Sequence, residues 1–178
     1  MRTIELQTPF DNNVLNDLHI GDKVLISGTI YTARDKAHQL LAELIINGKP
    51  LPIELAGTAI YYTGPAIDDS KKKIISAGPT TSSRMDQFTP QLLKLGVKVL
   101  IGKGRRDREV IESLKEHRVV YFCAVGGAGA YLAERIKSLK VIAFPELGME
   151  AIYELKVEQF PCYVAIDTRG NSIFNSNN

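Results

Sequence analysis

The amino-acid sequence predicts an α/β fold with one compact domain covering residues 1–178. Apolar runs with strand character alternate with helical patterns, and the strands outnumber the helices about two to one. The chain has 178 residues, of which 44% are hydrophobic and 24% charged, and is long enough to bury one core. The excess of strands predicts two sheet layers with helices on one side.

The first predicted strand covers residues 23–32, because KVLISGTIYT is rich in β-branched residues. A helix follows and closes at Gly48, with five apolar residues on one face: Ala37, Leu40, Leu41, Leu44 and Ile45. Short strands, each ending in glycine or a turn, are then predicted within residues 52–64, 72–78, 97–104, 118–127, 140–148 and 161–170. Further helices are predicted at residues 89–96, 108–117 and 130–139.

Charge and hydropathy exclude several classes of protein. The formal net charge is +2, and the basic runs at 71–73 and 102–107 are predicted to be solvated faces rather than contact patches. No apolar run approaches the roughly 20 residues that span a bilayer, and MRTIELQTPF lacks the apolar segment of a signal peptide. We therefore expect a cytoplasmic protein with no nucleic-acid or membrane partner.

Both cysteines lie in apolar, strand-like runs, Cys123 in VVYFCAV and Cys162 in FPCYVAI. A buried thiol in such a run behaves as a small hydrophobe. The three histidines are scattered along the chain, at His19, His38 and His117. Because no C-x-x-C pair exists either, the sequence predicts no metal site within this chain.

The segment TARD, residues 32–35, places an arginine at a predicted helix start. Thr32 and Asp35 have the spacing of a capping box, which puts Arg34 in the first helical turn. A cation there opposes the helix dipole, so an anion is expected nearby, either Asp35 or a ligand. The alternative is a surface arginine paired with a neighbouring carboxylate.

The segment SAGPTTSSRMD, residues 76–86, repeats this arrangement, because Ser83 and Asp86 form a second possible capping box around Arg84. Its hydroxyl residues could serve only as turn and cap residues. Two arginines at two helix starts nonetheless suit the binding of a dicarboxylate ligand, since each guanidinium fork can bind one carboxylate bidentately. Lys103, in IGKG at a strand end, is a third candidate cation.

Two phosphate-binding signatures do not match. IGKGRRD lacks G-x-x-x-x-G-K-[ST], and GGAGAYL has Leu132 where G-x-G-x-x-G needs Gly or Ala. A nucleotide-binding enzyme is therefore disfavoured. The glycine-rich turn at 126–129 still allows a close backbone approach to a ligand or to a neighbouring element.

Seven segments, taken in order, carry a resemblance to a known family: SGTIYTARDKAH, IYYTGPA, SAGPTTSSRMD, IGKG, AVGGAGAYL, FPELGMEAIYE and AIDTRGNS. They resemble the β subunit, or C-terminal domain, of the class I iron-sulfur fumarases and L-tartrate dehydratases. The resemblance covers residues 21–172. AVGGAGAYL and GMEAIYE look more like the fumarases than the tartrate dehydratases.

The resemblance implies a swivelling β/β/α domain and the hydration of fumarate to S-malate, with its reversal, at a 4Fe-4S cluster. In that family the cluster's cysteines belong to the α subunit or N-terminal domain. The resemblance therefore implies a cluster-bearing α subunit as partner, a small dicarboxylate as substrate, and a higher homo- or hetero-oligomer. No metal is expected on this chain itself.

The resemblance also implies roles for site residues. Arg34, Arg84 and Lys103 would bind the substrate, and Thr80 would be the catalytic base, with Lys103 as a second catalytic residue. A threonine hydroxyl is a weak base, so Thr80 needs a cation such as Lys103 or a proton-accepting neighbour to activate it.

Three residues are expected to support this site. Asp35 is expected to cap the helix and to orient Arg34. His38, one turn further on, either faces the site or packs at the domain junction. Glu150 is either an acid at the interface or behind the site or a surface residue, and the surface is the commoner place for a glutamate.

A non-catalytic module that binds dicarboxylates through the same arginines is the alternative from another class. Such a module would bind its ligand alone and would need no cluster-bearing partner. Activity that arises only when the chain is combined with a Cys-rich subunit would discriminate between the two.

Overall fold

The computed structural model describes residues 1–174 of the chain. Its strands are β1 (Thr3–Gln7), β2 (Lys23–Thr32), β3 (Ala59–Tyr61), β4 (Ala66–Asp68), β5 (Lys73–Ser76), β6 (Val99–Gly102), β7 (Val120–Cys123), β8 (Ile136–Ala143) and β9 (Ile152–Ile166). Its α-helices are α1 (Asn12–Asn16), α2 (Asp35–Ile46), α3 (Thr89–Lys94), α4 (Arg108–His117) and α5 (Gly129–Glu134), and its 3-10 helices are η1 (Ser82–Met85) and η2 (Pro145–Glu150). This mixture confirms the predicted α/β class.

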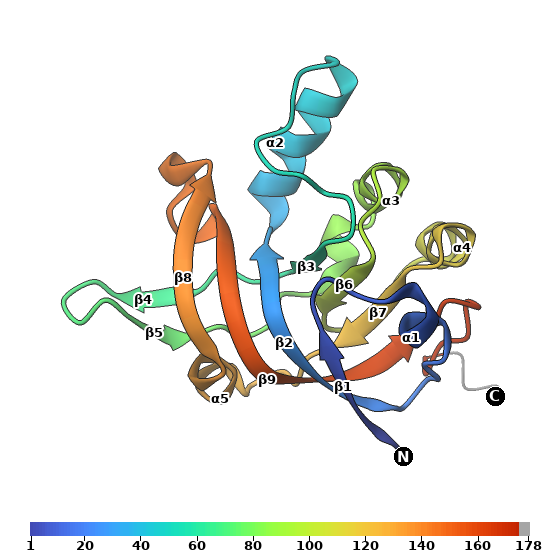
Figure 1. Cartoon of the computed structure of the whole chain (residues 1–178). Helices are drawn as coiled ribbons and strands as arrows, with labels where there is room; N and C mark the ends of the chain where they lie inside the picture. The colour runs from blue at the N-terminus through green and yellow to red at the C-terminus, as the bar shows by residue number, and fades with distance from the viewer. Residues whose placement is uncertain (175–178) are drawn as a thin grey trace.

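Five of the strands close into a hydrogen-bonded ring (Figure 1). β2, β3, β6 and β7 pair in parallel in that order, and β9 pairs antiparallel with both β7 and β2. Outside the ring, β1 extends the sheet beside β2, and β8 extends it beside β9. One sheet that closes on itself therefore replaces the two separate sheet layers that the strand count predicted.

The long antiparallel pairing of β2 with β9 is interrupted by a bulge in β9. The pair Ile26–Phe160 is followed by Gly28–Val157, so one residue of β2 faces two residues of β9, and Gln159 of this bulge has a φ of 48°. A bulge bends the strand that carries the extra residue, here β9. On the opposite strand, a Cβ atom on Gly28, whose φ is 113°, would lie 2.0 Å from Thr8 Oγ1, so a larger residue does not fit.

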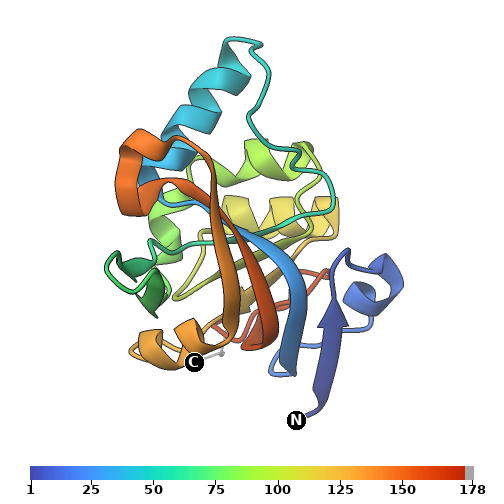
Figure 2. The same ribbon diagram turned by 60° about the vertical axis from the view of Figure 1, so that its left-hand side comes forward.

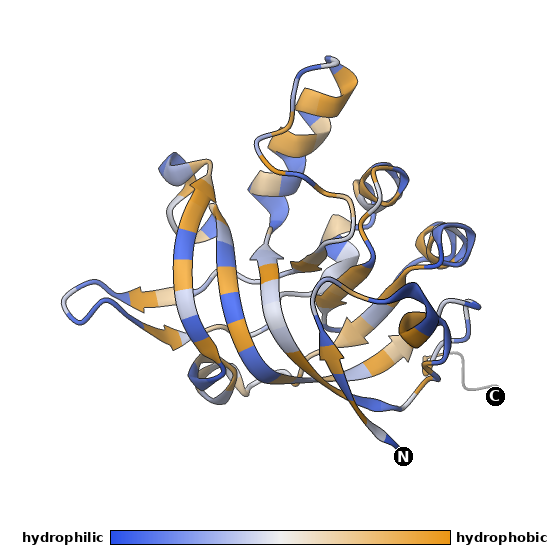
Figure 3. Ribbon diagram, viewed as in Figure 1, coloured by the Kyte–Doolittle hydropathy of each residue, from blue (hydrophilic) through white to orange (hydrophobic). Residues whose placement is uncertain are grey.

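The strands divide their apolar side chains between two clusters. Tyr61 and Phe122 point into the ring, where Tyr61 meets Phe160 of β9 with ring centroids 5.3 Å apart. Their neighbours Ile60 and Tyr121 belong instead to the cluster that contains α2, α3 and α4. Figure 2 shows these three helices on the same side of the ring, and Figure 3 shows hydrophobic and hydrophilic residues alternating along β8 and β9.

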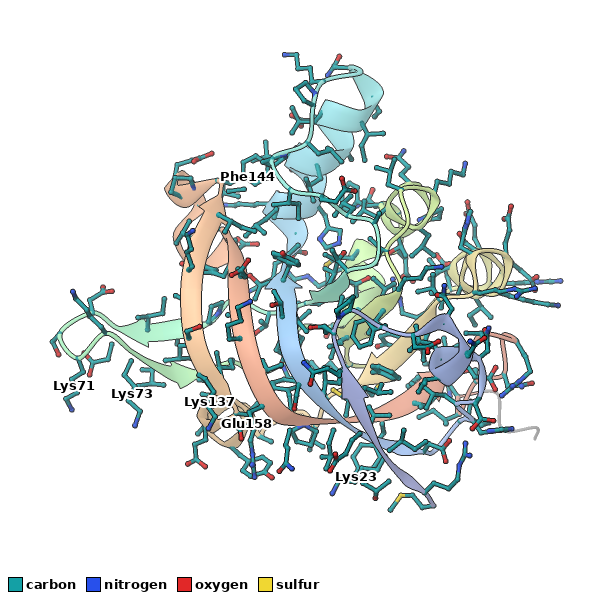
Figure 4. All side chains as sticks on the ribbon, viewed as in Figure 1. Lys23, Lys71, Lys73, Lys137, Phe144 and Glu158 are labelled. Atoms are coloured by element: carbon teal, nitrogen blue, oxygen red, sulfur yellow. The ribbon has the colours of Figure 1, made fainter. Side chains whose placement is uncertain are left out.

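A two-stranded hairpin, β4 and β5, projects from the ring (Figure 1). The chain leaves the ring after β3 and returns through the segment that carries Thr80 and Arg84. Figure 4 shows Lys71 and Lys73 on this hairpin, and the whole run 71–73 is exposed, which confirms its predicted solvation.

Element boundaries agree with prediction where local signals are strong. The strand at 23–32 and the helix at 108–117 have the predicted bounds, and Asp107 caps α4 by accepting the Val110 N–H at 2.8 Å. The helix predicted at 130–139 is wrong in its second half. There α5 ends at Glu134 and the chain pairs with β9 as strand β8.

Candidate functional site

The residues singled out in the sequence gather where parallel strands end. β2, β3 and β6 run in parallel, so their carboxyl ends meet at one edge of the sheet. Arg34 follows β2, and Lys103 follows β6. Ligands of α/β proteins bind at the carboxyl ends of parallel strands, both in open sheets and in closed barrels. The fold therefore brings these two cations to the edge where a ligand is expected.

Arg34 and Arg84 converge on the carboxylate of Asp35. Arg84 Nε donates to Asp35 Oδ1 at 2.8 Å, and Arg34 Nη2 lies 3.6 Å from Asp35 Oδ2. Within residues 1–174, the Nε of Arg34 and the Oδ2 of Asp35 are buried without a hydrogen-bond partner. Because buried polar atoms are nearly always hydrogen-bonded, this cluster has the unused capacity that a ligand site needs.

The capping box predicted at TARD is wrong. Arg34 is itself the N-cap residue of α2, and Thr32 still belongs to β2. The Thr32 hydroxyl donates to Ala151 O at 3.3 Å and accepts the Tyr153 N–H at 3.0 Å. Thr32 therefore ties the end of β2 to the start of β9, and α2 begins without a side-chain cap.

Glu150 lies beside Arg34 rather than on the open surface. Its Oε1 is 3.9 Å from Arg34 Nε and 3.5 Å from the backbone N of Lys36, in the first turn of α2. The Glu150 side chain is only 21% exposed. Arg34 is thus flanked by two carboxylates, Asp35 from its own helix and Glu150 from η2.

Thr80 and Lys103 lie on adjacent segments. The backbone N of Thr80 donates to Tyr62 O at 2.7 Å, and the next residue, Thr81, forms a parallel β-bridge with Lys103. Lys103 is exposed, and a Cβ atom on Gly126 would lie 3.7 Å from its Cδ. The glycine-rich turn therefore lies next to the stem of Lys103.

Gly129, at the other end of the glycine-rich turn, packs against the end of β5 and the residue that follows it. Gly129 O accepts the Ala77 N–H at 3.0 Å, and a Cβ on Gly129 would lie 2.3 Å from Ser76 Oγ. Of the two uses left open for the turn, the structure shows the close approach to a neighbouring element.

His38 is buried on α2, where its ring packs edge-to-face against Tyr62 at 5.3 Å. Its Nδ1 lies 2.8 Å from Arg34 O. Burial lowers the pKa of His38 to about 4, so the ring is neutral at pH 7 and Nδ1–H donates to this carbonyl. His38 therefore holds the backbone from which the Arg34 side chain extends.

Arg106 is a residue that the sequence did not single out. The run 102–107 was predicted to be solvated, but the Arg106 side chain is 0% exposed. Its Nε donates to Asp86 Oδ1 at 2.6 Å and its Nη2 to Thr89 Oγ1 at 2.7 Å. Asp86 is thus the partner of Arg106, and the second predicted capping box, around Arg84 in η1, is also wrong.

Cys162 is buried and Cys123 partly buried, as expected of apolar runs. Burial raises the pKa of both thiols. Among residues 1–174, no three His, Cys, Asp or Glu side chains are grouped so that they could hold a metal ion. This part of the chain does not fit a 4Fe-4S cluster, which requires several thiolate ligands. Nor do these residues include a helix of sufficient length and apolarity to cross a membrane.

The chain matches the family model described as "Fumarase C-terminus" over residues 1–177. It is 37% identical over 175 residues to Fumarate hydratase 2 of Leishmania major and 39% identical over 162 residues to the aerobic class I fumarate hydratase of Escherichia coli (strain K12). The alignments cover 96% and 90% of this chain but 31% and 30% of those two relatives. The chain thus spans less than a third of their length.

A shorter relative is covered almost throughout. The chain is 40% identical over 167 residues to a candidate L(+)-tartrate dehydratase subunit beta of Methanocaldococcus jannaschii. That alignment covers 88% of this chain and 84% of the relative. The matched region therefore occurs both as a separate polypeptide and within longer ones.

Proposed function

The chain belongs to the Fumarase C-terminus family, and on this premise we propose that it is the β-subunit part of a hydro-lyase that interconverts fumarate and S-malate in the cytoplasm. The observation that carries the proposal is the convergence of Arg34 and Arg84 on Asp35 at the sheet edge that also bears Lys103. Its relatives named as fumarate hydratases and as a tartrate dehydratase subunit support the hydro-lyase class.

Substrate binding is assigned to the three cations. A guanidinium fork binds a carboxylate through two parallel hydrogen bonds, and Arg84, which is 53% exposed, has donors free for this. Arg34 has its buried Nε free of any hydrogen bond within residues 1–174. Asp35 and Glu150 keep both guanidiniums in place and limit the local excess of positive charge.

Proton transfer is assigned to Thr80. In the dehydration of S-malate, deprotonated Thr80 takes a proton from the carbon beside a carboxylate, and the C–H electron pair forms the C=C bond. The hydroxyl group on the neighbouring carbon departs with its bonding pair as hydroxide, and this hydroxide and the proton together account for the water released. The cluster of the partner subunit, when bound, would supply the Lewis acid for that hydroxyl group. Thr80 is too weak a base alone, so the nearby Lys103 ammonium is assigned to stabilise its deprotonated form. The cations also stabilise the charge that develops on the substrate carboxylate.

A 4Fe-4S cluster is assigned to a partner α subunit, since the described residues of this chain do not fit one. This chain, acting as one domain over residues 1–178, would then bind and orient the substrate and move its proton. We propose that it is of the swivelling β/β/α type and turns against that partner within a larger oligomer.

L-tartrate is the second candidate substrate, and the 40% identity to a candidate tartrate dehydratase subunit over most of that protein favours it. Tartrate differs from malate by one hydroxyl group. The same two arginines would bind its carboxylates, so the dehydration step assigned to this chain is the same for both substrates.

The proposal is tested by anaerobic purification of the tagged chain from its own host. We expect a co-purifying, iron-containing, Cys-bearing subunit and turnover of fumarate, whereas turnover of L-tartrate alone would move the assignment to the second substrate. A chain that comes out alone, iron-free and inactive, yet binds dicarboxylates, would establish the non-catalytic module instead.

A further inference from the structure

Ser82 lies at the centre of the candidate site, two residues from Thr80 and two from Arg84, and it is buried. It bonds to Lys103 twice. Ser82 N donates to Lys103 O at 2.9 Å, and Lys103 N donates to Ser82 Oγ at 3.0 Å. Ser82 therefore joins the segment that carries Thr80 and Arg84 to the backbone of Lys103.

The Ser82 hydroxyl is held in turn by Tyr121, a buried residue of β7. The phenol oxygen lies 2.8 Å from Ser82 Oγ and 2.9 Å from Gly104 O. A carbonyl can only accept, so the single phenol proton goes to Gly104 O, and the Ser82 hydroxyl donates its own proton to the phenol oxygen. The chain of bonds thus begins at Lys103 N and ends at Gly104 O, and fixes both sides of the Lys103 backbone.

The side chains of Ser82 and Tyr121, with the bonds that join them to Lys103 N and Gly104 O, are called the relay below, and they are tightly packed. A Cβ atom on Gly102 would lie 2.0 Å from Ser82 Oγ and 2.8 Å from Tyr62 Cδ2. The guanidinium of the buried Arg106 lies over the Tyr121 ring, 5.0 Å from its centroid, and makes a cation–π contact with it. The position of the Ser82 hydroxyl is therefore set by packing as well as by hydrogen bonds.

From these contacts we infer that Ser82 and Tyr121 are positioning residues for Lys103, setting its place relative to Thr80 and Arg84. The inference rests on the proposed function, because a positioning role for these residues requires that Lys103 is catalytic. Neither side chain needs to touch the substrate. A displacement of about 1 Å at a reacting group can cost on the order of 100-fold in rate, so the relay would act mainly on kcat.

The experiment uses the assembled enzyme, purified anaerobically with its partner, and the variants Ser82→Ala and Tyr121→Phe. We expect each to lower kcat by about 10- to 100-fold while KM changes less than about threefold. Thr58→Val is the matched control, since its hydroxyl donates to Leu55 O at 2.7 Å, away from the site at the start of β3. Its kcat is expected to stay within about twofold of the wild type.

A second measurement separates positioning from a merely structural role. In a Lys103→Ala background, Ser82→Ala should lower the residual kcat by less than about threefold, because the residue that it positions is gone. A loss as large as in the wild-type background would overturn the inference. So would failure of both Ser82→Ala and Tyr121→Phe to assemble with the partner, since this would assign the relay to folding alone.

The outcomes also separate this inference from the proposed function. If the wild-type assembly turns over neither fumarate nor L-tartrate, the proposed function is overturned. If the wild type is active while Ser82→Ala and Tyr121→Phe stay within twofold of it, the proposed function stands and the positioning role is lost.

Discussion

Two arginine–aspartate pairs lie close together in this protein, and they differ in burial and in how many hydrogen bonds their guanidinium groups make. Arg106 and Asp86 are 0% and 7% exposed, and the guanidinium donates to Asp86, to Thr89 and, at 3.3 Å, to the hydroxyl of Tyr62. Arg84 is 53% exposed and donates to Asp35 alone among the side chains of residues 1–174.

The comparison shows how one pair of residue types serves two purposes. A buried pair in which each guanidinium nitrogen and each carboxylate oxygen is hydrogen-bonded holds loops together, and breaking it leaves a charge without compensation. An exposed pair contributes about 0–1 kcal/mol to stability, because water screens it and competes for its donors. The arginine of an exposed pair can therefore exchange the aspartate carboxylate for a ligand carboxylate at little energetic cost.

The largest effect on stability is expected from Arg106→Ala. It leaves Asp86 buried beside an empty space, and breaking such a pair costs about 3–5 kcal/mol of the free energy of unfolding. Denaturant unfolding of the chain measures this loss. A loss below about 1 kcal/mol would show that the two arginine–aspartate pairs do not differ in the way described.

Arg84→Ala should show the opposite behaviour. We expect kcat/KM of the assembled enzyme to fall by about 100-fold or more, since charged hydrogen bonds contribute roughly 1.5–3 kcal/mol each, while the free energy of unfolding changes by less than about 1 kcal/mol. Arg34→Ala should reduce kcat/KM similarly. Arg108→Ala, which removes an exposed arginine from helix α4, is the control and should leave the kinetics unchanged. Near-normal kinetics of Arg84→Ala would remove it from the site.

His38 lies between the two pairs, bonded to Arg34 O and packed against Tyr62. Its folded-state pKa of about 4 is below the ordinary 6.5, so the unfolded chain binds more protons between these values and stability falls as pH falls through this window. The loss is on the order of 3 kcal/mol. His38→Asn should remove that part of the pH dependence of the unfolding free energy, and an unchanged slope between pH 7 and pH 4 would contradict the buried neutral ring.

Asp35→Asn is expected to have the smallest effect. The substitution keeps a group that can accept the Arg84 Nε–H but removes the charge that orients both guanidiniums, so kcat/KM should fall by about 10-fold. Steady-state kinetics of the assembled enzyme, with Lys36→Ala as a control at the exposed next position, would measure it. Kinetics unchanged from the wild type would show that the charge of Asp35 does not orient the arginines.

Local signals predicted much of the fold. β2 and α4 have the expected bounds because β-branched residues fill one and Asp107 caps the other. The helix predicted at 130–139 ended early, because β9 offers this segment a strand partner that lies far along the chain. Periodicity within a short window cannot report such a partner.

In the candidate site, too, local signals predicted some features, and contacts between distant segments decided the others. The segments TARD and SAGPTTSSR indicated Arg34 and Arg84, and the structure brings both to one carboxylate. Neither predicted capping box formed, because the hydroxyl of Thr32 bonds to the start of β9 and Asp86 bonds to Arg106. Burial of Arg106 has no local signal, since GKGRRD looks like any solvated basic run.

The ring of strands has a consequence for how the chain is made on the ribosome. β2 is synthesised early, whereas β9, which pairs with most of its length, comes more than a hundred residues later. Pairings between such distant segments form slowly, and unpaired strand edges promote aggregation. Until β9 has emerged, the nascent chain carries β2 with one open edge, so a messenger truncated before β9 would yield a protein prone to self-association and degradation.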